Sequence, residues 1–530
     1  MPTTLEPLPN DPTVLREQLA ASQAAVAARD AVIATRDTEI EQLRGRLCYR
    51  EAELEKLKFE LARLKRMRFG RASEKLDGQI EQLELLIEEL ETPTTTASPI
   101  ATGETPKRRP VRQALPDHLP RESVVHEPGC VCPDCGGVLR AIGEDVTEIL
   151  EYVPEHWKVA RHVRPKHVCD ACDTLVQAPA VSRPIPKSYA GPGLLAHVLV
   201  SKYCDHLPLY RQSKIYARDG VELDVSTLAG WVGQASALVR PLVEAIGTHV
   251  MAGNKLHADD TPVPVLDPGR GRTKTGRLWT YVRDDRNSGD DTPPAVRFCY
   301  TPDRKGERPR QHLKPFIGTL QADGYAGFHH LYDSGTIHEA ACWAHARRKF
   351  FECHQATGSP IATAILEQIK ALYALEAQVR GQSAAQRRAA RQADARPVLD
   401  ALKNQLIEAR RAISAKSALA GAINYALSRW PALTRYCEDG VLEIDNNIAE
   451  NALRCVALGR KNFLFAGADS GGERAASVYT LIGTALLNGV NPEAWLKHVF
   501  ERIADLPISR ICELLPWNVK DKLAADESSD

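Results

Sequence analysis

The chain of 530 residues lacks an excess of charge of either sign, because 68 Lys and Arg residues balance 68 Asp and Glu residues. This balance excludes a uniformly basic protein that coats nucleic acid, and equally an acidic tail protein. Long apolar runs are also missing, since the best stretch, Leu194–Val200, is far too short to cross a bilayer. The opening segment, Met1–Thr13, is acidic and rich in proline, without the apolar stretch of a signal peptide. We therefore expect a soluble, cytoplasmic protein with no membrane partner.

Cysteine is too scarce for a disulfide scaffold, with 13 residues in 530, but five of them lie between Cys130 and Cys172. Four of these five form two Cys-x-x-Cys turns, and two such turns offer one zinc ion a tetrahedral set of thiolates. We predict a zinc-ribbon-like domain over residues 120–182 that holds a structural Zn²⁺. Four thiolates leave no open coordination position, so this ion would stabilise structure only. Two redox disulfides are the alternative, and they fit a cytoplasmic chain poorly. The predicted zinc ligands are Cys132, Cys135, Cys169 and Cys172.

Before this domain, apolar residues recur every seven positions among good helix formers, which predicts a coiled coil within residues 14–91. Self-association into a homo-oligomer is one expectation, and an intramolecular hairpin with the apolar helix Ile80–Leu90 is the alternative. Residues 92–119 are rich in Thr, Pro and Ser and predict a flexible basic linker. The repeating positions are Leu19, Val26, Ile33, Ile40, Leu47, Leu54 and Leu61.

Residues 187–250 follow the zinc-binding segment and predict helices, among them Gly193–Tyr203, Leu209–Asp219 and Ser226–Val239. Two short helices joined by a tight turn are compatible with a DNA-reading helix-turn-helix. Ordinary helical packing explains the pattern equally well, so both interpretations stay open.

From Lys255 the pattern changes to strands. Three strands, a helix and a fourth strand that ends at Asp323 predict an RNase H-like α/β domain. In that fold the first and fourth strands are neighbours, which would bring Asp259 and Asp323 face to face. Neither a P-loop nor a Gly-rich fingerprint follows a strand, which argues against a doubly wound nucleotide-binding sheet.

Converging carboxylates suit phosphodiester cleavage, because hard oxygen ligands hold the Mg²⁺ or Mn²⁺ ions that assist such displacements. Glu450, within the segment Asp445–Arg454, offers a third carboxylate. Each of these residues also has an ordinary structural interpretation. Asp at a strand end often forms a turn, and Asn447-x-x-Glu450 is close to a capping box.

Between Asp323 and Glu450 lie 127 positions (450 − 323), more than an RNase H-like core needs. The helical pattern of Ile361–Ala420 predicts a helical insertion over about residues 355–440. Its arginines would either hold the DNA backbone or be merely solvated. They are Arg380, Arg387, Arg388, Arg391, Arg396, Arg410 and Arg411.

Several long motifs resemble, in order, those of insertion sequence 66 family transposases, over about residues 40–520. They are Met67–Leu76, the paired Cys-x-x-Cys turns, His257–Val263, Gln321–Gly327, Cys342–Phe350, Asp445–Gly467, Gly483–Trp495 and Leu514–Asn518.

The resemblance implies a DDE transposase with a catalytic domain over residues 187–480 and a helical C-terminal segment over 481–520. Asp259, Asp323 and Glu450 are similar to the catalytic triad that binds Mg²⁺ or Mn²⁺. The implied reaction is cleavage at the terminal inverted repeats of a mobile element and transfer of the freed 3′-OH to target DNA. The family also implies companion proteins. Candidates for DNA contacts are His345, Arg347, Arg348, Arg454, Arg460 and Lys461.

Two positions depart from the family pattern. The first motif commonly reads Asp-Glu-Thr, whereas here Asp260 follows Asp259 and becomes a rival for the first catalytic position. Alternation along a strand places only one of these neighbours on the site face. Asn451 stands where the family commonly has Arg. A zinc-containing DNA-binding regulator without catalysis and a metal-dependent nuclease without strand transfer are the rival functions.

Overall fold

The computed structural model describes residues 115–129, 131–153, 156–267 and 272–527, together with the isolated positions 20, 23, 26, 29 and 36. The chain divides into two compact units, Met1–Pro110 and Val111–Asp530, and the features that follow belong to the second. The predicted coiled coil at 14–91 and most of the predicted linker at 92–119 lie outside the described residues.

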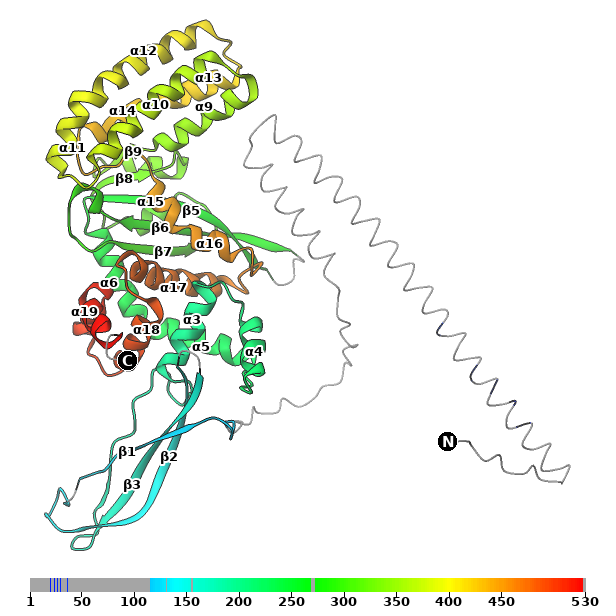
Figure 1. The fold of residues 1–530 in the computed structure, drawn as a ribbon, viewed down its shortest axis with the longest axis vertical. Helices are drawn as coiled ribbons and strands as arrows, with labels where there is room; N and C mark the ends of the chain where they lie inside the picture. Colours follow the sequence, from blue (N-terminus) through cyan, green and yellow to red (C-terminus); the bar gives the residue numbers. More distant parts are fainter. Residues whose placement is uncertain are drawn as a thin grey trace. The chain divides into compact units, whose positions relative to one another are not determined.

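A four-stranded sheet opens the described part of the second unit (Figure 1). Its two long strands form an antiparallel hairpin, to which β1 adds in parallel and β4 antiparallel. The near end of the hairpin, where β2 ends and β3 begins, is buried, with Leu150 and Val159 in the main core. The far end, where β2 begins and β3 ends, exposes Ile142 and Val146. The far end therefore has little apolar material of its own to hold it. The strands are β1 (Arg121–Val125), β2 (Leu139–Val153), β3 (His156–Cys169) and β4 (Leu175–Gln177).

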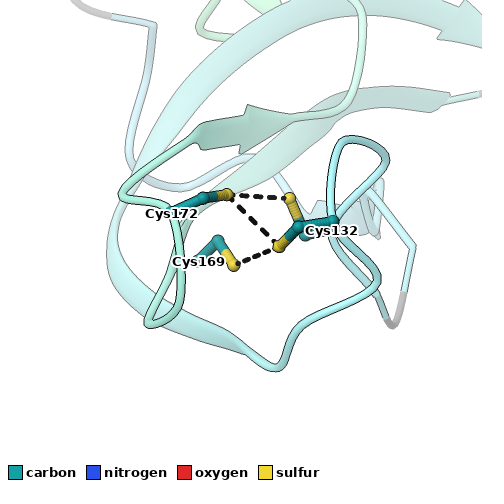
Figure 2. Close-up of side chains that lie close together, drawn as sticks. Cys132, Cys169 and Cys172 are labelled. Atoms are coloured by element: carbon teal, nitrogen blue, oxygen red, sulfur yellow. Dashed lines mark hydrogen bonds between the residues drawn. The ribbon is translucent and has the colours of Figure 1, made fainter.

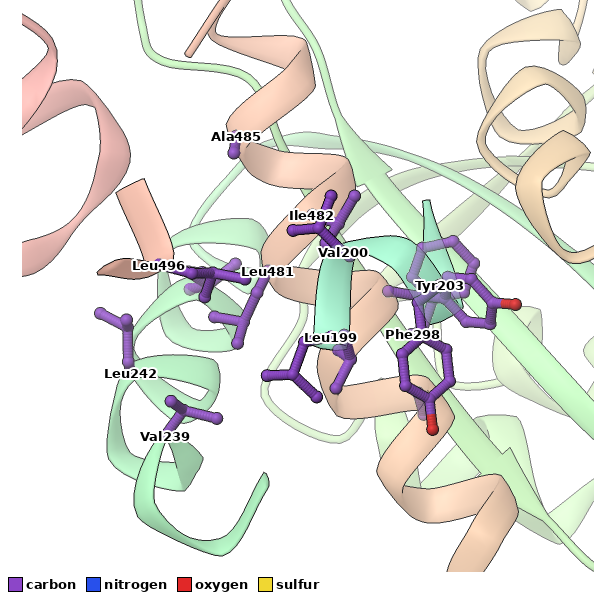
Figure 3. Close-up of a cluster of buried hydrophobic side chains, with 14 of the residues drawn as sticks. Leu199, Val200, Tyr203, Val239, Leu242, Phe298, Leu481, Ile482, Ala485 and Leu496 are labelled. Atoms are coloured by element: carbon purple, nitrogen blue, oxygen red, sulfur yellow. The ribbon is translucent and has the colours of Figure 1, made fainter. Parts of the chain in front are cut away.

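Four helices follow and match the helical pattern of the sequence. Figure 3 shows Leu199, Val200 and Tyr203 of the first of them packed into the main core. The second is amphipathic and exposes Tyr210 and Arg211. These helices are α3 (Pro192–Tyr203), α4 (Leu209–Arg218), α5 (Val225–Leu238) and α6 (Arg240–Met251).

The central sheet has five strands in the order β7-β6-β5-β8-β9. The first three form an antiparallel meander, and β8 then pairs with β5 in parallel, with β9 parallel to β8 outside it. The first and fourth strands of this region are thus neighbours, as the sequence predicts. The strands and connecting helices are β5 (Lys255–Leu266), β6 (Thr273–Arg283), β7 (Ala295–Thr301), α7 (Glu307–His312), β8 (Gly318–Ala322), α8 (His329–Tyr332) and β9 (Ile337–Ala341).

A group of helices lies between β9 and the segment that carries Glu450, and it has a hydrophobic core separate from that of the sheet. Trp343 is fully buried there, packs edge-on against Trp430, and donates its indole N–H to the Leu433 carbonyl at 2.8 Å. The group comprises α9 (Trp343–Thr357), α10 (Pro360–Val379), α11 (Ala384–Ala390), the π-helical turn η3 (Arg391–Ala395), α12 (Arg396–Ala412), α13 (Ala418–Ser428) and α14 (Trp430–Thr434).

The C-terminal helices complete the core of the central sheet. Figure 3 shows Leu481 and Ile482 beside α3. The Thr480 and Thr484 hydroxyls accept backbone N–H groups of β7, from Phe298 and Val296. The molecule is therefore a mixed α/β protein with a helical C-terminal region. These helices are α15 (Asn447–Ala452), α16 (Arg454–Gly459), α17 (Asp469–Leu487), α18 (Pro492–Arg502) and α19 (Pro516–Glu527).

Candidate active site

The pairing of β5 with β8 brings two of the predicted carboxylates together. The last paired residues are His257 and Gln321, so continuing the parallel register by two positions sets Asp259 opposite Asp323. Both aspartates are half-buried, and each accepts a backbone N–H, Asp259 from Asp260 at 2.8 Å and Asp323 from Tyr325 at 3.1 Å.

Glu450 reaches the same place from α15, which packs against β5 and β6. The N-cap of α15, Asn446, makes no side-chain cap bond, and Glu450 Oε1 has no hydrogen-bond partner. Glu450 is therefore free of the capping-box role that its spacing allows. Instead, the Asn446 side chain donates to the Ala258 carbonyl at 2.9 Å and accepts from His257 Nδ1 at 3.1 Å. Burial lowers the pKa of His257 to about 3, so this clamp between β5 and α15 is uncharged.

The pKa of Asp259 is sensitive to the other acidic side chains around it. Burial and, to a lesser extent, the negative charges of Asp323, Asp260 and Glu450 together raise the pKa of Asp259 to about 7, although the hydrogen bond from the Asp260 backbone lowers it. Crowded, half-buried carboxylate oxygens are the hard donor set that Mg²⁺ or Mn²⁺ prefers, and a bound cation would relieve their repulsion. The residue types therefore fit the divalent metal that the sequence predicts, although among the described residues the clusters with donor atoms within 4.8 Å of one another include Glu450 and neither aspartate.

Asp260, the rival for the first position, has different surroundings. Its side chain is 2% exposed and forms ion pairs with Arg277 at 3.0 Å and Arg304 at 2.9 Å. A carboxylate held between two guanidinium groups has its lone pairs already engaged. The geometry therefore favours Asp259 over Asp260 as the residue open to a metal.

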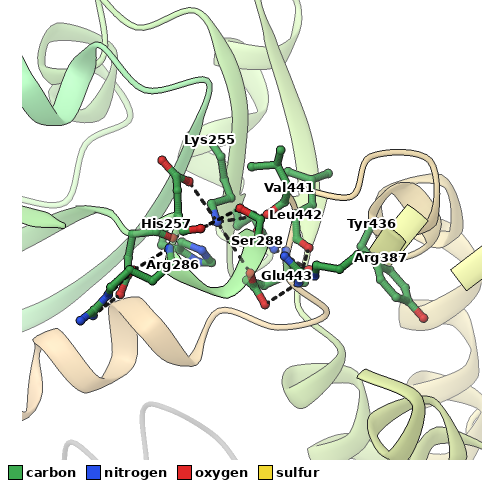
Figure 4. Close-up of polar contacts among 12 residues, drawn as sticks. Lys255, His257, Arg286, Ser288, Arg387, Tyr436, Val441, Leu442 and Glu443 are labelled. Atoms are coloured by element: carbon green, nitrogen blue, oxygen red, sulfur yellow. Dashed lines mark hydrogen bonds and ion pairs between the residues drawn. The ribbon is translucent and has the colours of Figure 1, made fainter. Parts of the chain in front are cut away.

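A buried ionic network holds residues 436–446, which we name the lead segment because it runs directly into α15. Figure 4 shows Lys255 donating to the Val441 carbonyl at 3.1 Å, and Glu443 lying between Lys255 and Arg387. On the other side, Gln321 exchanges two hydrogen bonds of 2.8 Å with the Glu443 backbone. The segment that delivers Glu450 is thus fixed to β5 and β8, the two strands that carry the aspartates.

The helical insertion supplies the rest of this network. Arg391 makes a bidentate ion pair with Glu376, with N–O distances of 2.7 and 2.6 Å. It also donates to the carbonyls of Tyr436 and Leu442 in the lead segment. Arg387 is 1% exposed and bonds Glu443 at 3.0 Å. For these two arginines, both sequence interpretations are wrong, because they face neither DNA nor solvent. Helical periodicity does not tell a buried arginine from an exposed one when its acidic partner is distant in sequence.

The residues predicted to contact DNA lie in three different environments. Arg347 and Arg348 line a pocket of about 690 Å³ between α9 and α10, with Lys370, Tyr373 and Asn447. In contrast, His345 faces Glu450, with His345 Nδ1 3.7 Å from Glu450 Oε1. A final group lies on or after α16: Arg454 and Lys461 are exposed, and Arg460 donates to the Pro262 carbonyl at 2.9 Å.

The predicted zinc ligands converge at the far end of the β2–β3 hairpin (Figure 2). Their four sulfur atoms lie within 4.8 Å of one another, with Cys135 Sγ 3.4 Å from Cys169 and 3.3 Å from Cys172. The Cys172 sulfur also donates to the Thr174 hydroxyl at 3.2 Å. Gly137 is required here because a Cβ would lie 2.9 Å from the Cys169 sulfur. The cluster supports a structural zinc, which would replace the core that this end of the hairpin lacks.

Within the described part of the chain, no helix combines the length and apolar character needed to cross a membrane.

Comparison with known families places four segments in one group. A family model described as "Transposase IS66 family" matches residues 187–474, and the "IS66 C-terminal element" matches 480–517. The "zinc-finger binding domain of transposase IS66" matches residues 129–173. A fourth model, "Transposase C of IS166 homeodomain", matches residues 56–124.

Two proteins of Sinorhizobium fredii (strain NBRC 101917 / NGR234) are similar over most of their length. "Uncharacterized protein y4hP" is 41% identical over 495 residues, covering 88% of this chain and 89% of the relative. "Uncharacterized protein y4qI" is 38% identical over 528 residues, covering 97% of this chain and 98% of the relative.

Proposed function

The chain belongs to the IS66 family of transposases, and from that premise we propose that it binds the ends of an insertion sequence and catalyses metal-dependent DNA cleavage and strand transfer. The observation that carries the proposal is the convergence of three carboxylates on the strand pair β5–β8. The parallel register sets Asp259 of β5 opposite Asp323, directly after β8, and the charge of Glu450 on α15 acts on Asp259. We assign these three carboxylates as the catalytic set. The strand order β7-β6-β5-β8-β9 supports an RNase H-like fold for this domain.

Each residue of the site has a task in this proposal. The three carboxylates would hold Mg²⁺ or Mn²⁺, which when bound activates the attacking oxygen and stabilises the leaving oxygen of an in-line displacement. In the first displacement, water attacks a phosphodiester at the element end, the P–O bond to the 3′ oxygen breaks, and a 3′-OH is released. In the second, that hydroxyl attacks a phosphodiester of target DNA, the target's P–O bond to its 3′ oxygen breaks, and the element end is joined to the target's 5′ phosphate while a target 3′-OH is released. The His257–Asn446 clamp and the lead segment fix the carboxylates relative to one another.

DNA would approach over the basic residues near these carboxylates. Arg347 and Arg348 belong to α9 and line the pocket that Asn447 of α15 closes, so they suit contacts to backbone phosphates. Arg454 and Lys461 are exposed on the other side of Glu450 in the chain, and we assign them the same task. Self-association through residues 14–91 and a need for companion proteins remain proposals from the sequence.

The test is cleavage and joining of DNA that carries the element's own ends, with Mg²⁺ or Mn²⁺, by wild type and by Asp323→Asn. We expect both activities in wild type and a loss of at least about 1,000-fold in the variant, because the metals and positioning supply most of the catalysis. Asp333→Asn is the matched control, since Asp333 is an exposed carboxylate that lies 3.3 Å from His330 on the surface.

The other outcomes separate the rival functions. Specific binding of the ends without cleavage, also after companion proteins are added, would favour a regulator without catalysis. Cleavage without joining would favour a nuclease. Cleavage that survives Asp323→Asn would show that the three carboxylates are wrongly assigned.

A further inference from the structure

A second group of metal-binding side chains lies beside the proposed catalytic carboxylates. Cys342 directly precedes α9, His345 follows three positions later on that helix, and Glu450 projects from α15. One donor atom of each residue lies within 4.8 Å of the other two. Cys342 is buried and the other two residues are half-buried, so the group is recessed from the surface.

Two of the three donor atoms are without a hydrogen-bond partner. His345 Nδ1 and Glu450 Oε1 are both buried, and they face each other at 3.7 Å, beyond hydrogen-bonding distance. Burying unpaired polar atoms is costly, so a native structure that keeps such a pair calls for an explanation. Zinc bonds of about 2.0–2.2 Å to nitrogen and oxygen set two tetrahedral donors roughly 3.3–3.6 Å apart. The observed separation is close to that of two ligands around one ion.

The surroundings of the Cys342 sulfur act in two directions. Burial raises the pKa of the thiol to about 12, so zinc binding here would release a proton, while a backbone N–H and a helix N-terminus stabilise negative charge on the sulfur. The backbone N–H of Asn446 donates to Cys342 Sγ at 3.2 Å. The sulfur in addition lies at the N-terminus of α9, a helix of 15 residues, where the helix dipole favours negative charge. Cysteine and histidine are soft donors that select zinc over Mg²⁺.

We propose that Cys342, His345 and Glu450 form a zinc site with three protein ligands and one open position. Zinc in this site would engage Glu450 and withdraw it from the catalytic Mg²⁺, so that zinc inhibits the DNA reaction. The binding site stands on the geometry alone, whereas the inhibition rests on the proposed function.

The chain would therefore bind two zinc ions with different affinities. The cluster of Cys132, Cys135, Cys169 and Cys172 offers four thiolates, whereas the second site offers one thiolate, one imidazole and one carboxylate. The first site fills at lower zinc concentration and supports folding, and the second fills only as zinc rises. Zinc would thus be required at low concentration and inhibitory at higher concentration.

The binding test measures zinc per chain on the full-length protein equilibrated with buffered zinc chloride. We expect two zinc ions per wild-type chain, and one in Cys342→Ser at zinc concentrations that saturate wild type. Even the outer partners of a metal ligand contribute about 10–100-fold in affinity, so loss of a ligand should weaken this site by more than about tenfold. Serine is a favourable N-cap residue, so this substitution should keep α9 intact.

Cys353→Ser is the matched control, because Cys353 is another buried, free cysteine on α9 and should retain both zinc ions. A single zinc in wild type, or a second zinc that persists in Cys342→Ser, would overturn the proposal.

The inhibition test adds zinc to Mg²⁺-dependent cleavage. In Cys342→Ser, we expect the zinc concentration that halves the variant's own zinc-free rate to rise by more than about tenfold. Equal zinc sensitivity in both proteins would overturn the inhibition. A second zinc that binds wild type and is lost in Cys342→Ser supports the site even if no cleavage is found, so failure of the proposed function is told apart from failure of this inference.

Discussion

Asp259 and Asp260 are adjacent in the sequence, yet their side chains have opposite surroundings. The Asp259 carboxylate meets the negative charges of Asp323 and Glu450, whereas that of Asp260 lies between Arg277 and Arg304. Alternation along β5 predicts that the two side chains point to opposite faces of the sheet, but it does not predict which of them faces the proposed metal. That choice depends on arginines of β6 and of the loop after β7, which no local pattern around residue 260 reveals.

This difference predicts opposite effects of two neighbouring substitutions. Asp260→Asn should lower the free energy of unfolding by about 3 kcal/mol, because it breaks the ion pairs of a 2% exposed carboxylate with Arg277 and Arg304. Asp259→Asn removes a repelled carboxylate, so it should cost little stability in metal-free protein while abolishing cleavage. Urea unfolding in the presence of a chelator, beside a cleavage assay, measures both effects. An equal loss of stability in the two variants would contradict the assignment.

At the scale of elements, the strands that carry the aspartates were predictable from sequence, and the next strand was not. β5, β6, β7 and β8 have clear β patterns bounded by turns. β9, by contrast, is only five residues long and ends in Ala340 and Ala341, and alanine is depleted in strands. The insertion was predicted as helical, but its attachment to the lead segment through Arg387 and Arg391 was not, because those contacts span about 50 positions.

This attachment predicts that the insertion controls the placement of Glu450. Arg391→Met should reduce the free energy of unfolding by about 3–5 kcal/mol, since Glu376 is left buried with a weakened partner. It should also raise the Mg²⁺ concentration needed for half-maximal cleavage, because the lead segment loses the three hydrogen bonds that its carbonyls accept from Arg391. Arg388→Met, at an exposed neighbouring arginine, is the control and should change neither quantity. Unchanged Mg²⁺ dependence in folded Arg391→Met would show that the insertion does not position the site.

The β2–β3 hairpin predicts a local response to zinc removal. In Cys172→Ser, we expect the loss of one zinc ion per chain and rapid tryptic cleavage between residues 131 and 175. Unfolding of the central sheet should change little, because only the near end of the hairpin belongs to the main core. Cys512→Ser, at an exposed cysteine outside the cluster, should retain the zinc. Global unfolding of Cys172→Ser would argue that zinc supports the whole fold.

At the scale of the molecule, the heptads in residues 14–91 predict that oligomerisation and catalysis belong to separate parts of the chain. A truncated protein that begins at residue 115 should be a monomer, whereas the full chain self-associates. Light scattering during size-exclusion chromatography measures both masses. A truncated protein that remains a dimer would place the contact in the second unit, and a monomeric full chain would favour the helical hairpin.

The position of the insertion in the chain affects how the protein is made. β5 to β9 are complete by Ala341, but Glu450 comes only after the whole insertion, and α17, which packs on β7, comes later still. During translation the ribosome therefore releases both aspartates long before the glutamate. A nascent or prematurely terminated polypeptide has most of the sheet and no third carboxylate. On the proposed assignment, such a product is unable to cut the chromosome of its host, and the nuclease becomes active only when synthesis is nearly finished.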